Sequence, residues 1–437
     1  MSPAIKCLLL LLVVAFFFIT EIIPLAVTAI AAALACFFLG FIPANQVFLG
    51  LADSTVVLFG GMFIVGAAMF YTGLAPKIGS MVVKLFGTGE NSLMIGIMVV
   101  AAIMSAFLSN TGTTACLMPV VLSICTTAKI SKGRELMPLA FAAGLGGTIT
   151  LIGTPPNMIA NMALRAAGMP ELEFTFFEFA YLGIPITIAG ILYMILIGKY
   201  ILPNRVDTAE PVAETENTCE FAYADDVPVE VICTSKKKQF ICGLIMVGVV
   251  VVMATNILPL EIAAIIGALL CVLTGCLTEK QAYNSIDWVT IFLFAGMIPV
   301  ATAMSTTGAG KLIAETTINL MGGNLSPMLL TAVLFILAVI LTQFMSNTAS
   351  KALLAPVGIA LSTQIGASPK AVLMAILIAS SCAFMTPVGT PPNTLVLGPG
   401  EYKFMDYVKA GSGLVITCLI VSMVIIPIVW PFFPAHT

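Results

Sequence analysis

Two copies of the tripeptide Ser-Asn-Thr, at residues 109–111 and 346–348, interrupt apolar stretches of this sequence. Each copy is followed about forty residues later by Gly-Thr-Pro-Pro-Asn, at residues 153–157 and 389–393. Polar residues and helix breakers at membrane depth are costly unless they line a cavity. Paired interruptions at matching positions of two halves point to the binding site of a transporter. These four segments are therefore predicted to form a site for a substrate and a cation.

The composition is that of a membrane protein. The chain has 437 residues, of which 60% are hydrophobic and 9% are charged, whereas soluble proteins carry about a quarter charged residues. Many apolar runs approach the length of about twenty residues with which a helix crosses a bilayer. We therefore predict an all-α polytopic membrane protein that has the lipid bilayer, and no nucleic acid, as a partner.

Histidine is nearly absent from the sequence. The only one is His436, at the extreme C-terminus. This argues against a haem, a histidine-ligated metal or a histidine general base within the membrane. The sequence also shows no constellation of histidine, cysteine and carboxylate residues. We therefore predict no enzymatic activity and no catalytic residue.

The two halves of the chain match over a long distance. Pro24 and Pro259 stand 235 residues apart, whereas the Ser-Asn-Thr copies stand 237 apart and the Gly-Thr-Pro-Pro-Asn copies 236 apart. So small a drift is not expected of unrelated apolar runs, and it indicates an internal duplication. Membrane repeat one is predicted at 1–202, with a hairpin at 92–128 and a broken helix at 136–168. A cytoplasmic linker follows at 203–238. Membrane repeat two is predicted at 239–437, with a hairpin at 326–366 and a broken helix at 371–398.

The order of apolar runs also predicts the topology. Each repeat would hold three spans, a hairpin, a broken helix and a final span, so it crosses the membrane an odd number of times and the second copy is inverted. This threading places thirteen lysine and arginine residues on one face and four on the other. The first face is then cytoplasmic, and both termini are external. We predict the plasma (inner) membrane as the location. The charge rule fits both re-entrant hairpins and pairs of full spans.

The Ser-Asn-Thr copies have the chemistry of an ion site. Their hydroxyl and amide groups can donate to an anion, and their oxygens can coordinate a hard cation such as Na⁺. The first N–H groups of the second hairpin arm also favour negative charge. The alternative is a polar turn that joins two spans in water. Two copies at matching places of inverted repeats favour the site.

Gly-Thr-Pro-Pro-Asn is a helix interruption. Its prolines remove N–H donors and free the carbonyls upstream, and Gly153 and Gly389 let the backbone approach an ion closely. The alternative is a simple proline kink. Glu21 and Glu261 lie near span ends, and acidic residues at span centres are almost absent. Neutral oxygen ligands fit Na⁺ coupling better than a proton relay, which needs intramembrane carboxylates or histidines.

The sequence resembles the divalent anion–sodium symporter family of dicarboxylate, citrate and sulfate carriers. The family signature is met at every fixed position from Ser380 to Val396, which reads SSCAFMTPVGTPPNTLV. The paired Ser-Asn-Thr copies and the segment 21–24 (Glu-Ile-Ile-Pro) also match. The resemblance implies a homodimeric elevator carrier, in which the first three spans of each repeat are static and the hairpins and broken helices move. Many relatives have one more N-terminal helix than this chain.

The resemblance also implies a set of site residues. The first sodium site would fall on Ser105, Ser109, Asn110 and Gly153, and the second on Thr342, Met345 (through its carbonyl), Asn347 and Gly389. The anion would lie between the two Ser-Asn-Thr copies at the ends of the hairpins. Its contacts would be Ser109, Asn110, Thr111, Ser346, Asn347 and Thr348, with Thr154, Pro155, Thr390 and Pro391 beside it.

Lys351 departs from the symmetry of the two halves. It lies one helical turn after Asn347, so it can share that face of the hairpin arm, and its counterpart in the first half is Thr114. An ammonium at membrane depth is expensive unless it is paired or wet, and a divalent anion is a natural partner. We therefore include Lys351 among the substrate-binding residues. The alternative is that Lys351 snorkels to the external surface.

The favoured function is secondary active transport of a small divalent anion, preferably a C4-dicarboxylate, coupled to Na⁺. A Na⁺-independent anion exchanger is the alternative, and a sulfate carrier or an anion channel is less favoured. Succinate, malate, citrate and sulfate all stay candidates, because the predicted contacts are hydroxyls, amides and backbone groups.

Overall fold

The computed structural model describes residues 2–20, 22–78, 81, 89–204, 221–223, 227–229, 235–255, 257–312 and 326–433. These residues form helices joined by short turns, and seven of the described helices are long and apolar enough to cross a membrane. The predicted all-α polytopic fold is confirmed. Glu21, His436 and most of the predicted linker lie outside the described residues.

The first half runs from α1 to α10. Its elements are α1 (Pro3–Thr20), α2 (Leu25–Phe38), η1 (Ala44–Gln46), η2 (Leu49–Ala52), α3 (Ser54–Tyr71), α5 (Glu90–Ser105), α6 (Asn110–Ala128), α7 (Lys132–Gly146), η3 (Pro155–Met158), α8 (Ile159–Ala166), η4 (Pro170–Leu172), α9 (Ala180–Tyr193), the π-helical η5 (Met194–Gly198) and α10 (Lys199–Ile201).

Two short strands precede the second half. β1 (Phe221–Tyr223) and β2 (Val227–Val229) pair in an antiparallel register that sets Phe221 opposite Val229, a hairpin that the sequence did not predict. The helices that follow are α11 (Lys236–Ala254), α12 (Leu260–Leu273), α13 (Glu279–Asn284), α14 (Trp288–Thr307), α16 (Pro327–Thr342), α17 (Asn347–Gln364), α18 (Pro369–Ser381), α19 (Pro391–Leu397) and α20 (Phe404–Val429). Since α11 begins at Lys236, the last three residues of the predicted linker belong to this helix.

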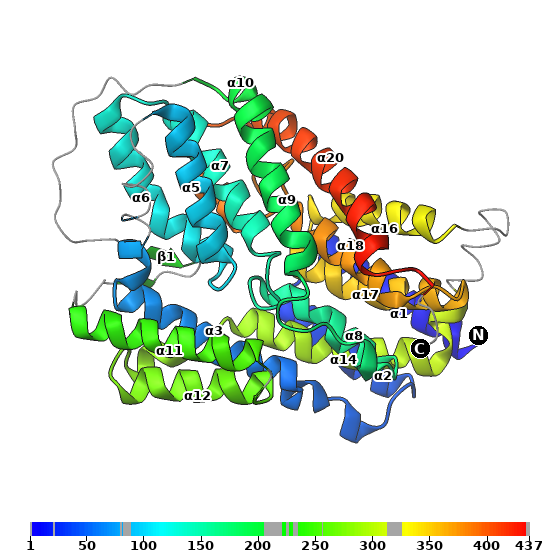
Figure 1. Cartoon of the computed structure of the whole chain (residues 1–437). Coiled ribbons are helices and arrows are strands. Elements are labelled where there is room, and N and C mark those ends of the chain that lie inside the picture. The colour runs from blue at the N-terminus through cyan, green and yellow to red at the C-terminus, as the bar shows by residue number, and fades with distance from the viewer. Residues whose placement is uncertain are drawn as a thin grey trace.

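One layer of the molecule joins the two halves through reciprocal helix contacts. Helix α2 packs on α14, and α12 packs on α3; all four lie along the lower part of the view in Figure 1. A Cβ added at Gly61 would lie 2.8 Å from the backbone carbon of Ala264, and one added at Gly296 would lie 2.5 Å from that of Ala29. Small residues let helix backbones approach this closely, so the same close packing occurs twice with the halves exchanged.

The second layer holds the hairpins and the broken helices (upper part of Figure 1). In the first half α7 packs against both hairpin arms, α5 and α6, and in the second half α18 packs against α16 and α17 in the same way. Nearly every residue of α7 and α18 is buried, because these helices are surrounded by their neighbours. The layer is closed by α9 against α20.

Candidate functional site

Each Ser-Asn-Thr copy starts the second arm of a hairpin. Ser109 is the N-cap of α6, and its Oγ accepts a hydrogen bond from the N–H of Gly112 at 3.1 Å. Ser346 caps α17 in the same way, through the N–H of Ala349 at 3.2 Å. Capping satisfies one of the four N–H groups that a helix start leaves without an intrahelical partner. Both tips therefore present helix N-termini, which favour anions.

We call each Ser-Asn-Thr copy a tip and the unwound segment at each Gly-Thr-Pro-Pro-Asn motif a break. In the first half, the tip contacts the break of the same half. The Ser105 hydroxyl donates to Asn110 Oδ1 at 2.6 Å. A Cβ added at Gly147 would lie 2.5 Å from Asn110 Oδ1 and 2.5 Å from Thr154 Cγ2, and one added at Gly153 would lie 3.1 Å from the carbonyl oxygen of Ala106. The structure thus brings Ser105, Asn110, Gly153 and Thr154 together.

The second half repeats this arrangement. The Thr342 hydroxyl lies 2.8 Å from Asn347 Oδ1 and 2.7 Å from the carbonyl oxygen of Ser380. A Cβ added at Gly389 would lie 3.3 Å from the carbonyl oxygen of Thr342. Met345 is buried in the turn between α16 and α17. Each half therefore pairs a buried hydroxyl with the Asn side chain of its tip.

Exposure separates the tips from the breaks. All six residues of the two Ser-Asn-Thr copies, Thr111 and Thr348 included, are half-buried, whereas Thr154 and Thr390 are buried. Pro155 is half-buried and Pro391 is exposed. The two threonines therefore lie deeper than the tips, whereas Pro391 of the second break reaches the surface.

The last residue of each Gly-Thr-Pro-Pro-Asn motif ties the unwound backbone together, a role that the sequence analysis missed. Asn157 Nδ2 donates to the carbonyl oxygens of Gly147 and Thr150, both at 3.0 Å. Asn393 Nδ2 donates to those of Ala383 and Thr386, at 2.8 and 2.9 Å. The signal that could have revealed this role is the repetition of the Asn in both motifs.

Lys351 is fully buried, so the expectation that it snorkels to the surface is wrong. Its Nζ donates to Asn157 Oδ1 at 2.9 Å and to Ser381 Oγ at 2.8 Å. None of the ion pairs found among the described residues includes Lys351. Its contact with Asn157 joins the second tip helix to the break of the first half.

This lysine contact belongs to a crossed packing of the two halves. Helix α17 packs on η3 and α8 of the first half, and α6 packs on α19 of the second. The helix that begins at each tip therefore packs against the broken helix of the other half. The two sets of site residues meet where these crossings lie.

A buried carboxyl group also escaped the sequence analysis. Glu135, in the first part of α7, is fully buried, and neither carboxylate oxygen has a hydrogen-bond partner among the described residues. In the sequence it follows Lys132 and Arg134 and stands one residue before the predicted broken helix at 136–168, so its burial was not predicted. Glu135 lies in the first turn of α7 and not at a span centre, so it adds a buried carboxyl group without changing the observation on span centres.

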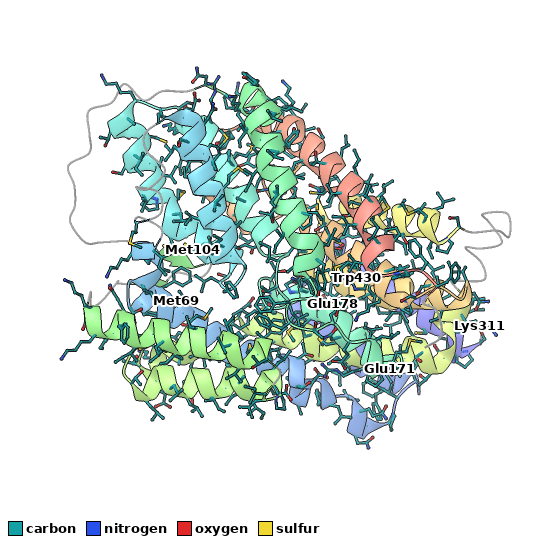
Figure 2. The ribbon with its side chains drawn as sticks, viewed as in Figure 1. Met69, Met104, Glu171, Glu178, Lys311 and Trp430 are labelled. Carbon is teal, nitrogen blue, oxygen red and sulfur yellow. The ribbon has the colours of Figure 1, made fainter. Side chains whose placement is uncertain are left out.

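Two groups of charged residues join elements of the structure. Arg165 on α8 pairs with Asp53 at 3.3 Å and with Glu173 at 2.7 Å. Glu178 pairs with Lys370 at 2.7 Å and accepts from Trp430 Nε1 at 2.7 Å. Figure 2 shows Glu178 and Trp430 side by side, with Glu171 and Lys311 on the same side of the molecule and Met69 and Met104 on the other.

A cavity of about 350 Å³ lies elsewhere, between α8, α14 and α17. Ala163, Ala301 and Ala360 line it, with Pro356 and Lys311. None of the predicted substrate or cation residues contributes to its wall. Within the described residues no group of three or more histidine, cysteine and acidic side chains could hold a metal.

An all-helical chain with many apolar helices, two capped polar tips and two unwound breaks at its centre is a multi-pass membrane transporter. The chain belongs to the citrate transporter family (CitMHS), whose sequence profile matches residues 15–370. This family transports solutes and is not a family of enzymes, and the resemblance to the divalent anion–sodium symporters is confirmed.

Individual relatives agree with this assignment. The chain is 30% identical to an uncharacterized transporter of Haemophilus influenzae over 95% of this chain and 89% of that protein. It is 25% identical to a sodium-dependent high-affinity dicarboxylate transporter 3 of Caenorhabditis elegans over 97% and 82%. The crystal structure of the Alcanivorax borkumensis YdaH transporter superposes with a TM-score of 0.66 and 14% identity, over 98% of each chain, which shows the same fold.

Proposed function

We propose that this protein is a secondary active transporter that moves a small divalent anion, preferably a C4-dicarboxylate, together with Na⁺. The observation that carries the proposal is the repeated pairing of a buried hydroxyl with the tip Asn, Ser105 with Asn110 at 2.6 Å and Thr342 with Asn347 at 2.8 Å. Two sets of neutral oxygens at two helix starts are suited to two cations with an anion between them. The name of the Caenorhabditis elegans relative, a sodium-dependent dicarboxylate transporter, supports both ions.

The anion would be held by positive electrostatic potential. Helix starts α6 and α17 offer N–H groups and the positive end of the helix dipole. The Lys351 ammonium adds positive charge, and none of the ion pairs found among the described residues includes it. The proposed substrate residues are Ser109, Asn110, Thr111, Ser346, Asn347, Thr348 and Lys351, with Thr154, Pro155, Thr390 and Pro391 beside them.

The cations would use hydroxyl, amide and carbonyl oxygens. Such ligands suit hard cations. The backbone of Gly153 lies so close to the carbonyl oxygens of Gly147 and Ala106 that an added Cβ would be 2.7 and 3.1 Å from them, so backbone carbonyls gather at this point. The proposed sodium ligands are Ser105, Ser109, Asn110 and Gly153 in the first half, and Thr342, Met345, Asn347 and Gly389 in the second.

We propose that transport occurs by an elevator movement within a homodimer. The reciprocal contacts of α2 with α14 and of α12 with α3 support an inverted duplication, with 1–202 and 239–437 as the repeats and a cytoplasmic linker at 203–238. The layer that contains these four helices would be static, and the layer of hairpins and broken helices would move. Both termini would be external to the plasma (inner) membrane.

A second candidate function is Na⁺-independent exchange of two anions. The observation that favours it is Lys351, because a fixed ammonium beside the break supplies charge that a bound Na⁺ would otherwise supply. A sulfate carrier and an anion channel are less favoured. Exchange without net uptake, unaffected by replacing Na⁺ with K⁺, would identify the exchanger.

The test is uptake of labelled succinate by purified protein in liposomes. An inward Na⁺ gradient should drive accumulation, and a K⁺ gradient should not. Saturation and counterflow of preloaded succinate distinguish a carrier from a channel, through which flux rises without saturation. A competition panel of malate, citrate and sulfate then ranks the substrates. Succinate uptake at the same rate with and without a Na⁺ gradient would disprove Na⁺ coupling.

A further inference from the structure

The two breaks match in most of their hydrogen bonds and differ in one. In both, the Asn side chain donates through Nδ2 to two backbone carbonyls. Asn157 Oδ1 in turn accepts from the Thr154 hydroxyl at 2.9 Å and from the Lys351 ammonium at 2.9 Å. Asn393 Oδ1 is fully buried, yet it has no partner among the described residues. The same acceptor is thus doubly occupied in the first break and empty in the second.

The residues that could serve Asn393 are present but engaged elsewhere or unpaired. Thr114, the counterpart of Lys351 on α6, donates to the carbonyl oxygen of Asn110 in its own helix at 2.9 Å. The hydroxyl of neighbouring Thr113 is fully buried and, in the part of the chain described, unpaired. Thr390 stands three residues before Asn393, as Thr154 stands before Asn157. Helix α6 packs on α19, which carries Asn393.

A buried amide oxygen without a partner is costly, and in native proteins such groups are nearly always served by protein, water or an ion. In the first break the partner is a cation, the ammonium of Lys351. Where the chain has Thr114 instead of a lysine, a free monovalent cation can take the place of the ammonium. The amide oxygen of Asn393 is a neutral oxygen of the kind that binds hard cations. Thr113 on α6 and Thr390 at the start of α19 carry further neutral oxygens on the two helices that pack together there.

We propose that Asn393 Oδ1 is a ligand of an exchangeable Na⁺, bound between α6 and α19, and that the Lys351 ammonium is its permanent counterpart in the first break. This site is separate from the two sodium sites proposed at the tips, which use Asn110 and Asn347. The identity of the cation rests on the proposed Na⁺ coupling. The carrier would therefore hold one tethered cation and one exchangeable cation at equivalent places.

The sharpest test moves the ammonium from one half to the other. Thermal unfolding of the purified, anion-free protein is followed against NaCl, with choline chloride holding the ionic strength constant. A ligand that binds the folded state raises the Tm with its concentration. Thr114→Lys should raise the Tm in the absence of Na⁺ and weaken its dependence on Na⁺. Thr114→Met, which has similar bulk and no charge, should not reproduce this effect.

A second pair of variants keeps the test decisive if the Thr114 variants fail to fold. Asn393→Asp replaces an amide oxygen with a carboxylate of the same shape, and it should lower the Na⁺ concentration for half-maximal stabilisation by about tenfold or more. Asn157→Asp makes the matched change beside Lys351, which already supplies the cation, and should leave that concentration unchanged. Each variant loses the two hydrogen bonds that its Asn Nδ2 donates to backbone carbonyls. Because these losses are equivalent, they cancel in the comparison.

The outcomes separate this inference from the proposed function. If Asn393→Asp and Asn157→Asp respond equally to Na⁺, or if Thr114→Lys behaves like Thr114→Met, water serves Asn393 and the inference is overturned. Na⁺-driven succinate uptake together with either result would leave the proposed function intact. A specific Na⁺ response of Asn393→Asp without any succinate uptake would support the cation site and refute the proposed function.

Discussion

In the first half the tip amide of Asn110 is held by Ser105 at 2.6 Å, and in the second the amide of Asn347 is held by Thr342 at 2.8 Å. The tips are therefore nearly equivalent. The breaks behind them are not, because only Asn157 receives an ammonium. In a duplicated chain the two tips can stay alike while the two breaks diverge. Such a chain can bind two similar ions at its tips and still carry a lysine at the break of one half only.

Removing either tip amide should have the largest effect. Asn110→Ala and Asn347→Ala are each expected to abolish transport and to leave the fold intact, since each Asn would serve both the anion and a cation. A hydrogen bond to a charged group contributes about 1.5–3 kcal/mol, which is more than tenfold in affinity. Succinate uptake in liposomes measures the loss, and gel filtration checks the fold. Near wild-type uptake by either variant would remove that tip from the site.

The equivalence of the tips could be foreseen from the sequence, and the difference between the breaks could not. Interrupted apolar runs specify hairpins and broken helices locally, so a sequence alone can predict where they fall. The bond from Lys351 to Asn157 joins residues from opposite halves, and no spacing along the chain reveals it. The burial of Glu135 could not be predicted for a related reason. A carboxylate next to Arg134 in the sequence resembles a charge in a loop until the surrounding helices are known.

Removing the ammonium should make the two breaks alike and have the next largest effect. Lys351→Thr restores the residue of the first half, so we expect a KM for succinate that is raised by about tenfold, from the loss of a hydrogen-bonded charge near the anion, and a steeper dependence of uptake on Na⁺. Uptake against succinate and Na⁺ concentration measures both.

Lys351→Met is the matched control, because it keeps most of the bulk of the side chain while it removes the charge and the hydrogen bonds to Asn157 and Ser381. It should raise the KM as Lys351→Thr does. If both variants keep the wild-type KM and Na⁺ response, the ammonium supports the break structurally and has no role in binding the anion.

A smaller effect is expected where the moving and static layers share an ion pair. Arg165 on α8 pairs with Asp53 at the start of α3, and the proposed elevator movement would break this contact. Partly exposed ion pairs contribute about 0.2–1 kcal/mol, so Arg165→Gln should change the maximal uptake rate by up to about fivefold, with little change in KM. Initial rates at saturating succinate measure this.

Arg134 provides the control for this comparison. It pairs with Glu90 at 2.9 Å, and this pair joins α7 to α5 within the layer that is proposed to move. Arg134→Gln should therefore leave the maximal rate within the error of the assay. Equal effects of the two substitutions would mean that the Arg165 contact is not broken during transport.

The smallest effect is expected from cutting the chain between its halves. The close approaches of Gly61 to Ala264 and of Gly296 to Ala29 hold the halves together, and the predicted cytoplasmic linker lies largely outside the described residues. Residues 1–204 and 235–437, expressed as two chains, should therefore assemble and take up succinate with an unchanged KM. Co-purification through a tag on one chain measures assembly. Gly296→Val adds an isopropyl group where even a Cβ has no room, so it should prevent co-purification of the split chains. The same change at Gly40 tests only the strain of its positive φ, because an added Cβ there would meet no atom within 4 Å. Split chains that never associate would show that the linker is needed to bring the halves together.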